Sequence, residues 1–299
     1  MRGDIMDWIE RINSAVNYIE ENLDKEISYE RIAQIVGCSV YNFQRMFSYI
    51  ADKPLSEYIR NRRLTMAAFD LINSKDKIID IAMKYGYDSH DSFTRAFQKF
   101  HGVLPSKVRN ETVRLKSCPK ISFQIIIKGE TYMNYQIEQL PGFTVSGFKH
   151  RICTNDAFNI VPQIWDTAWK NGTMDCMTEL FMKADYRPAG FLGISAGGRW
   201  GNSEEMDYYL AVTTYVDVLE CKRVEPFDGM DTFEFPQATW VIFEANGELP
   251  DAVQQVYKKF YTEWLPNSGY ELDDLPVIES YMQNNRQEVW IAIVKSGNS

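Results

Sequence analysis

The sequence predicts two domains of different class, an all-α domain built from two helix-turn-helix units and, after it, an α+β domain. The first observation is a pattern of Ile-Ala, Gly, Ser and Phe-x-Arg-x-Phe that starts at Ile32 and returns at Ile81. The second is a change from helical to strand periodicity after about residue 130. The third is a repeat within this later part, at an offset that pairs Pro141 with Pro236.

Composition excludes several classes of protein. The 299 residues are 45% hydrophobic and 24% charged, which is ordinary for a globular chain with two cores. There is no apolar run of membrane-spanning length and no signal-peptide pattern, so we expect a cytoplasmic protein that does not bind membranes. The five cysteines and three histidines are scattered without ligand spacing. We therefore expect reduced thiols, no metal site and no cofactor.

The net charge of −9 is distributed unevenly. Residues 1–110 hold 16 Lys and Arg against 15 Asp and Glu, whereas residues 111–299 hold 16 against 26. The acidity therefore belongs to the second domain, whose partner we do not expect to be a polyanion. Arg60, Arg62 and Arg63 crowd one segment of the first domain, where they could be solvated, support the fold or contact phosphate.

The helices of the first domain follow from caps and apolar spacing. Ser28 is a plausible N-cap for the first helix of one unit, and Gly37 ends that helix. The next helix starts at Ser39, and Pro54 opens a long helix over 55–73. That helix spans about 28 Å, which suits two reading units about one DNA turn, or 34 Å, apart. The second unit repeats the plan and has a turn that is one residue longer between its glycine and its serine.

The second helix of each unit has an apolar face and a polar face. Burial of Phe43 and Phe47 in one unit and of Phe93 and Phe97 in the other turns the polar side chains outward. Arg and Gln can make bidentate contacts with guanine and adenine edges, so these faces are candidates for reading a major groove. A plain solvated helix face is the alternative. The candidate DNA-binding residues are Tyr41, Asn42, Gln44, Arg45, Asp91, Thr94, Arg95 and Gln98.

Residues 111–130 are predicted to be a linker with a short strand-like run over 121–127, and residues 131–299 the α+β domain. That domain is a duplicated β-α-β-β arrangement with helices near 156–171 and 250–265. The repeat aligns the helix aromatics, Trp165 with Phe260 and Trp169 with Trp264. Two like halves that face each other leave a cleft, which is a usual place for a ligand.

Glu279 is the most informative polar residue of the second domain. Strand alternation puts it on the same face as Val277 and Tyr281, an unusual position for a charge unless that face meets solvent or a ligand. A carboxylate among aromatic side chains favours an amphipathic compound, a cationic one in particular. The aromatic candidates could equally be core residues. The candidate ligand-binding residues are Trp165, Trp169, Trp240, Trp264, Glu279, Tyr281 and Trp290.

Two families resemble these patterns. The string I-A-x(3)-G-C-S-V-Y-N-F-Q-R-M-F, with Y-I-R-N-R-R-L, S-F-T-R-A-F and F-H-G-V-L-P-S after it, resembles the AraC/XylS DNA-binding domain over about residues 6–110. The strings I-E-Q-L-P-x-F-x-V-x-G, W-L-P-N-S-G-Y-E and L-P-V-I-E-S-Y resemble the GyrI-like effector-binding domain over about residues 133–296. The resemblance implies base contacts by Tyr41, Gln44, Arg45, Asp91, Thr94 and Arg95, and a ligand-facing Glu279.

Together these patterns predict a transcription regulator that binds double-stranded DNA through its first domain. Its second domain is expected to sense a small amphipathic, in particular cationic, effector, and RNA polymerase is the expected further partner. The alternative is a GyrI-like hydrolase or detoxifying enzyme that acts on a xenobiotic. No catalytic residues are assigned, because Cys153, Cys176 and Ser195 have no histidine at a readable spacing and His150 is the one histidine of that domain.

Overall fold

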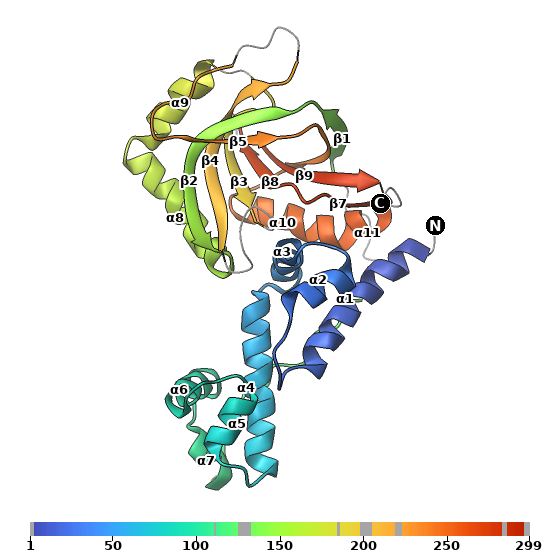
Figure 1. Ribbon diagram of the computed structural model, residues 1–299, viewed down its shortest axis with the longest axis vertical. Coiled ribbons are helices and arrows are strands. Elements are labelled where there is room, and N and C mark those ends of the chain that lie inside the picture. Colours follow the sequence, from blue (N-terminus) through green and yellow to red (C-terminus); the bar gives the residue numbers. More distant parts are fainter. Residues whose placement is uncertain are drawn as a thin grey trace. The chain divides into compact units, whose positions relative to one another are not determined.

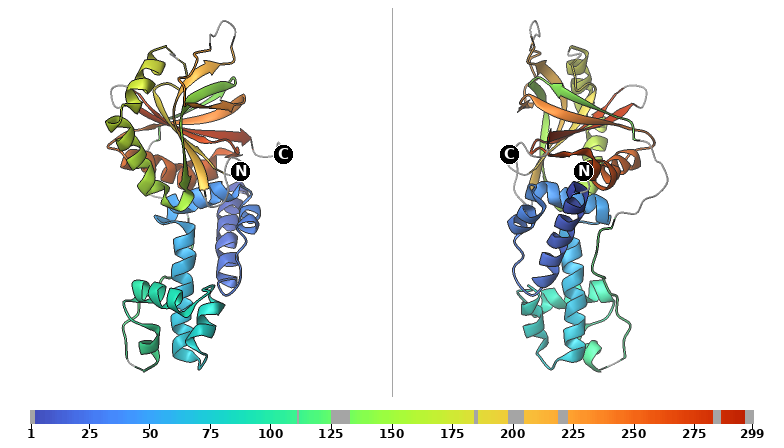
Figure 2. Two further views of the ribbon diagram at one scale, coloured as in Figure 1. Left: turned by 60° about the vertical axis from the view of Figure 1, so that its left-hand side comes forward. Right: turned by 90° about the vertical axis from the view of Figure 1, so that its right-hand side faces the viewer.

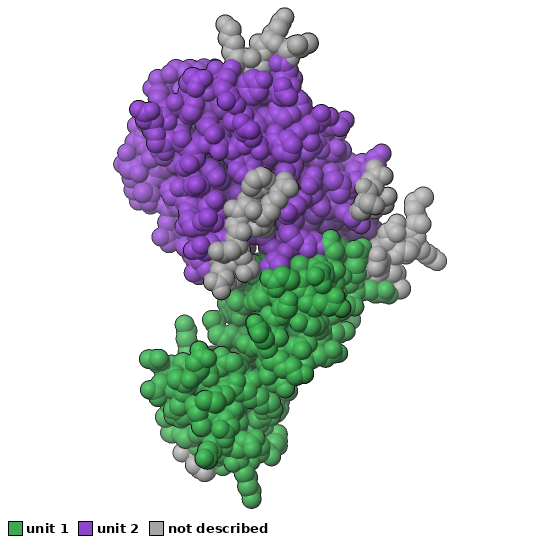
Figure 3. All heavy atoms as spheres, viewed as in Figure 1, with its two compact units in different colours: residues 1–37, 43–125 green, residues 38–42, 126–299 purple. Residues whose placement is uncertain are grey.

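The structure is a computed structural model, which describes residues 3–110, 112–124, 133–183, 186–197, 205–218, 223–282 and 286–295. The chain folds into two compact units (Figure 3). One consists of residues 1–37 and 43–125, and the other of residues 38–42 and 126–299. Two domains are therefore described below, a helical one and an α+β one.

Seven helices form the helical domain within the described residues (Figure 1). Helices α2 and α3 make the first helix-turn-helix unit, α5 and α6 make the second, and α4 joins them. The helices are α1 (Gly3–Glu21), α2 (Tyr29–Val36), α3 (Val40–Ala51), α4 (Leu55–Asn73), α5 (Ile78–Lys84), α6 (His90–His101) and α7 (Pro105–Asn110).

Local signals explain where these helices begin and end. The Ser28 hydroxyl accepts a hydrogen bond from the Arg31 amide at the start of α2, and Ser89 accepts one from the Ser92 amide at the start of α6. Gly37 ends α2 with a φ of 80°, a left-handed conformation that favours glycine. The bounds of α4 coincide with the predicted helix, because Pro54 precedes it and its apolar spacing is regular.

Both helix-turn-helix units have an aromatic core. Phe43 and Phe47 of α3 are at most 1% exposed, and Phe93 and Phe97 of α6 are fully buried. The second unit closes around α4, where Leu64 and several neighbouring residues pack against the two phenylalanines. The predicted apolar faces of both helices are thus confirmed, and α4 contributes to a core at each end.

The α+β domain has one antiparallel sheet with helices beside it (Figures 1 and 2). The strands follow the order β1-β6-β9-β8-β3-β4-β2-β5, and β7 pairs with β9 outside this path. They are β1 (Tyr135–Leu140), β2 (Phe143–Cys153), β3 (Phe191–Ala196), β4 (Glu205–Val216), β5 (Asp231–Phe235), β6 (Ala238–Ala245), β7 (Tyr270–Leu272), β8 (Val277–Tyr281) and β9 (Gln287–Lys295). The helical segments are a 3₁₀ turn (Thr154–Asp156), α8 (Ala157–Lys170), α9 (Thr173–Lys183), α10 (Asp251–Lys259), a π-helical segment (Phe260–Trp264) and α11 (Leu265–Ser268).

The strand order makes the predicted duplication visible. Strands β1, β2, β3 and β4 of the first half correspond to β5, β6, β8 and β9 of the second. When each strand is replaced by its counterpart, the strand order is the same read from the other edge of the sheet. Each half gives its first strand to the other: β1 pairs with β6, and β5 pairs with β2. The centre of the sheet is the β3–β8 pair, in which Gly193 lies opposite Glu279. The two halves therefore meet along β3 and β8.

The two faces of the sheet have different environments. One face curls around a core in which Phe143 of β2 contacts Trp240 of β6, although β9, β8, β3 and β4 lie between these strands in the sheet. On the other face, α8 contacts β2 and α9 contacts β4 in one half, and α10 contacts β6 and β9 in the other. Side chains of β3 and β8 on the helix face lie between these two sets of helices.

Two segments differ from the sequence prediction. Helix α9 is not predicted by the sequence, because its apolar residues Met174, Met177 and Leu180 follow a loop without a strong cap signal. The strand-like run over 121–127 lies partly outside the described residues, and its described part, 121–124, is in no strand. In the described part of the chain, no helix is long and apolar enough to cross a membrane.

Candidate functional site

Helices α3 and α6 carry the predicted DNA-reading residues. The sequence predicts that these side chains face outward, but Tyr41, Asn42, Gln44 and Arg45 of α3 are at most 9% exposed. With 100° of rotation per residue, the face that carries Tyr41, Gln44 and Arg45 is opposite the face that carries Phe43 and Phe47. Ser39 fixes the start of α3 by accepting a hydrogen bond from the Asn42 amide. The Arg45 guanidinium lies 5.7 Å from the centre of the Tyr49 ring, one turn further along the same helix.

The equivalent face of α6 is polar. Arg95 and Gln98 are exposed, and the Asp91 side chain is 88% exposed beside His90. Thr94 is half-buried, and its hydroxyl has no hydrogen-bond partner among the described residues. Helices α3 and α6 have equivalent caps and buried phenylalanines, but the chemistry of their polar faces differs. Gln44 corresponds to Thr94, and Tyr41 corresponds to Asp91.

A cluster of aromatic and carboxylate groups lies on the helix face of the sheet, where the two halves of the α+β domain meet. It consists of Trp165 on α8, Tyr208 on β4, Tyr257 on α10, and Glu279 and Tyr281 on β8. Tyr208 and Tyr257 are at most 1% exposed. The other three are half-buried. We call these five residues the cleft cluster, because the sequence predicts a cleft where the two halves meet.

Hydrogen bonds and ring contacts organise the cleft cluster. The Tyr257 hydroxyl donates to Glu279 Oε1 at 3.0 Å, and the Tyr281 hydroxyl donates to Oε2 at 2.8 Å. The Trp165 indole N–H donates to the Tyr208 hydroxyl at 2.7 Å. The rings of Trp165 and Tyr281 meet edge to face, with 4.9 Å between their centres. Both carboxylate oxygens are therefore held by phenols that come from a helix and from the strand itself.

Gly193 makes room for this arrangement. A Cβ atom at this position would lie 2.3 Å from the Tyr208 hydroxyl and 3.6 Å from Glu279 Oε2. Any side chain there would displace Tyr208, so the missing side chain is what lets a phenol and a carboxylate approach the same point of the sheet.

Comparison with known proteins identifies both domains. Residues 133–294 match the family described as GyrI-like small molecule binding domain, which is more than half of the chain. Residues 32–111 match a helix-turn-helix domain family. The chain is 41% identical over 98 residues to the HTH-type transcriptional activator AarP of Providencia stuartii, an alignment that covers 33% of this chain and 73% of AarP.

The chain belongs to the AraC-type regulators with a C-terminal GyrI-like domain. It is also 36% identical over 98 residues to the multiple antibiotic resistance protein MarA of Escherichia coli K12, across 33% of this chain and 77% of MarA. The AraC-type family is one of transcription regulators, not of enzymes. Among solved structures, SAV2435 bound to tetraphenylphosphonium is 22% identical, with a TM-score of 0.43, and covers 54% of this chain and 94% of that one.

The GyrI-like domain brings together three of its seven predicted ligand residues: Trp165, Glu279 and Tyr281. Trp240 and Trp290 are fully buried in the core on the other face of the sheet. They contact each other there, 6.2 Å apart. Neither side chain lies in the cleft cluster, because Ile278 rather than Glu279 shares the face of Trp290.

The remaining two tryptophans lie away from the cleft cluster. Trp264 is 8% exposed and stacks on Phe260 and Tyr270 at the end of α10. Trp169 is 63% exposed and touches the edge of Phe191. They occupy equivalent positions in the two halves, yet one packs into an aromatic core and the other meets solvent.

Sequence reasoning missed Tyr208 and Tyr257. Strand alternation does place Tyr208 on the face of Leu210 and Val212, against the helices, but nothing in the sequence shows that this face reaches Trp165. Tyr257 lies within the predicted second helix, with no signal that points it toward Glu279. No group of three or more His, Cys, Asp or Glu within the described ranges is arranged to hold a metal ion.

Proposed function

We propose that this regulator reads two successive major grooves with α3 and α6, and that an amphipathic cation bound at the cleft cluster controls it. The observation that carries the proposal is Glu279, a half-buried carboxylate whose two oxygens accept hydrogen bonds from Tyr257 and Tyr281 beside the ring of Trp165. The family comparison supplies the coarser function, a DNA-binding regulator with a small-molecule domain.

The repeated arrangement of α3 and α6 supports the DNA-binding part of the proposal. Arg45 and Arg95 occupy equivalent positions on helices with equivalent aromatic cores, joined by the 19-residue helix α4. Such a helix is about 28 Å long, comparable with the distance of about 34 Å between successive major grooves on one side of a duplex. We assign the base contacts to Tyr41, Asn42, Gln44 and Arg45 on α3, and to Asp91, Thr94, Arg95 and Gln98 on α6.

The chemistry of the cleft cluster supports the ligand part. Aromatic rings attract cations through their negatively charged faces, and a carboxylate in a partly dehydrated setting adds a direct charge interaction. Phenol donors orient the carboxylate without neutralising it. A ligand with an apolar body and a delocalised or quaternary positive charge interacts favourably with both the aromatic rings and the carboxylate. An anion is repelled by the carboxylate.

RNA polymerase completes the proposed set of partners. AarP is a transcriptional activator by name, and this chain shares its helix-turn-helix region. We infer that the DNA-bound regulator acts on the polymerase at the promoter, and that the ligand alters this action.

Calorimetry with a matched pair of ligands tests the ligand part. The pair is an aryl trimethylammonium compound and its tert-butyl isostere, in which carbon replaces the charged nitrogen. Wild type should bind the cation about tenfold or more tightly than the isostere, and Glu279→Gln should remove this preference while binding of the neutral compound changes little. Glu244→Gln is the matched control, because Glu244 is exposed on β6 and belongs to the opposite face of the sheet.

Two outcomes would contradict the proposal. If Glu279→Gln weakens both ligands equally, Glu279 has a structural role and charge does not select the ligand. If neither ligand is affected, the ligand lies elsewhere. Tyr257→Phe provides an intermediate step: it removes the donor to Oε1 but keeps the carboxylate, so the preference for the cation should persist.

A further inference from the structure

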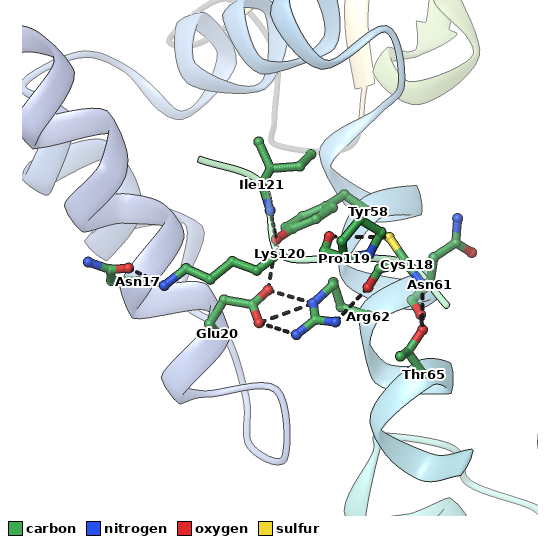
Figure 4. Close-up of polar contacts among 10 residues, drawn as sticks. All are labelled: Asn17, Glu20, Tyr58, Asn61, Arg62, Thr65, Cys118, Pro119, Lys120 and Ile121. Carbon is green, nitrogen blue, oxygen red and sulfur yellow. Dashed lines mark hydrogen bonds and ion pairs between the residues drawn. The ribbon is translucent and has the colours of Figure 1, made fainter. Parts of the chain in front are cut away.

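Residues 113–123 belong to neither family match, since one ends at residue 111 and the other begins at residue 133. The sequence predicts a linker there, and these residues contain no helix or strand. They nevertheless lie along the helical domain between α1 and α4 (Figure 4), and they contact both of its helix-turn-helix units. We call residues 113–123 the strap.

The beginning of the strap is anchored on the second unit. Val113 and Leu115 pack against the core that contains Phe93 and Phe97 of α6. They are half-buried, while Arg114 and Lys116 between and after them are exposed. This alternation is typical of an extended segment that lies flat on a surface.

The middle of the strap is pinned to α4. Cys118 is buried, its amide donates to the Thr65 hydroxyl at 3.0 Å, and its carbonyl accepts from Arg62 Nη1 at 2.6 Å. Arg62 also forms an ion pair with Glu20 of α1 at 2.5 Å, in which both side chains are about one-tenth exposed. Arg62 thus joins the strap to two helices, α4 and α1 (Figure 4).

Glu20 lies at the centre of this polar network. Burial raises the pKa of its carboxyl, but hydrogen bonds from Arg62 and Tyr58 and the positive charge of Arg62 bring that pKa below its ordinary value. The Tyr58 hydroxyl donates to Glu20 at 2.8 Å and accepts from the Ile121 amide at 3.1 Å. The charged carboxylate of Glu20 therefore holds Arg62 and Tyr58, two residues of α4 that bond the strap.

The end of the strap is anchored on α1 and on α3 of the first unit. The Asn13 side chain binds the backbone of Phe123 twice, accepting from its amide and donating to its carbonyl, each at 2.9 Å. The Phe123 ring meets the ring of Phe47 edge to face, with 6.3 Å between centres. Phe47 is a core residue of α3, so this end of the strap contacts the packing that holds a reading helix.

We propose that the strap is a positioning segment that fixes α3 and α6 relative to one another for reading two grooves of DNA. This inference rests on the proposed function. Helix α4 alone connects the two units as a single rod, which can bend and twist. The strap follows the same path as a second connection, from the core of one unit to the core of the other. Two parallel connections resist the bending that one allows, so the reading helices are held in the geometry that DNA requires before they bind.

The test uses the full chain and a duplex selected by that chain from a random pool. Derived duplexes carry one base pair more or fewer between the two half-sites, which turns one half-site by about a tenth of a turn relative to the other. A further duplex keeps only one half-site. The strap is partly released by Asn13→Ala with Thr65→Val, which removes two of its hydrogen bonds to α1 and one to α4. Phe123→Ala is a second release that leaves every helix unchanged.

Wild type should bind the selected duplex best and lose affinity steeply when the spacing changes. On the selected duplex the released variants should bind about tenfold more weakly than wild type, because they lack three hydrogen bonds or one ring contact. Their affinity should then decrease little further when the spacing is altered. On the single half-site they should equal wild type, because each unit is intact. Asn61→Ala is the matched control, since Asn61 bonds to Glu57 within α4.

Two results have different meanings. If wild type binds the single half-site as well as the full duplex, reading by two units fails, and the proposed function with it. If wild type needs both half-sites but the released variants keep its spacing profile, the strap has no positioning role. An equal loss on all duplexes, single half-site included, would likewise overturn the inference, because it would show a general loss of folding.

Discussion

The two domains are both internal duplications, but their copies are used differently. In the helical domain, the capping and core residues of the two copies have equivalent roles. Ser39 caps α3 and Ser89 caps α6, and Phe47 and Phe97 both fill a core. The proposed reading of two grooves explains this, because a DNA duplex offers the same groove geometry to each copy one turn apart.

In the α+β domain, equivalent residues have diverged. Trp165 lies in the cleft cluster, while its counterpart Phe260 is fully buried in the core. Glu279 and Tyr257 come from the second half only, and Trp165 and Tyr208 from the first. In the proposed site one small ligand would touch both halves at once, so the halves would supply different groups to it. A duplication thus preserves the fold in both domains, but it preserves the site only where the target repeats too.

The largest effect expected from this comparison concerns two tryptophans of the α+β domain. Trp240→Ala should lower the free energy of unfolding by about 3–5 kcal/mol, because it opens a cavity in a fully buried core. Trp165→Ala should cost less stability but weaken the binding of the cationic ligand, since Trp165 is half-buried beside Tyr281. Denaturant unfolding and calorimetry measure the two effects. Loss of ligand binding by folded Trp240→Ala, with Trp165→Ala unaffected, would reverse the roles of the two tryptophans.

The next effect tests whether the helical copies are equivalent. Arg45→Ala should weaken binding to the selected duplex by about 1–3 kcal/mol and relax base preference at one position. Arg95→Ala should do the same in the other half-site, although by less, because the exposed carboxylate of Asp91 on the same face of α6 repels phosphates. Binding to duplexes with single-base changes measures both. An effect confined to one arginine would show that only one copy reads sequence.

The smallest effect concerns a point where the helical copies differ. His101 ends α6, is buried and contacts the Leu64 carbonyl at 3.1 Å, whereas the equivalent position in the first copy is Ala51. Burial lowers the pKa of His101, and the hydrogen bond to Leu64 offsets this only in part. The neutral form of His101 is thus favoured in the folded state. Its contribution to the free energy of unfolding is present above about pH 6.5 and is lost as pH falls through the lowered pKa of the folded state.

Acid should therefore loosen the second copy before the first. Amide exchange would show faster exchange in α5 and α6 than in α2 and α3 as pH decreases below about 6. His101→Gln, which can still donate to Leu64, should remove the difference. Equal loosening of both copies in wild type and variant would mean that His101 does not control it.

Local signals made most of the elements predictable from the sequence. Serine caps, Gly37, Pro54 and regular apolar spacing act within a few residues, so α3, α4 and α6 lie where the sequence indicated. The offset repeat predicted the duplication because both halves retain their turns and helix aromatics. Alternation along β8 likewise indicated that Glu279 occupies an unusual face, before any neighbour was known.

Only the tertiary structure decided which groups meet. The sheet curls, so Trp240 and Trp290 close a core on one face, while Tyr208 and Tyr257 reach the cleft cluster on the other. The sequence did not indicate what anchors the strap, because its anchors are Asn13, Arg62 and Thr65, residues far away along the chain. Periodicity reports whether a face is buried, but it does not report what buries it. That depends on the curvature of the sheet and on contacts between distant segments, which no short stretch of sequence contains.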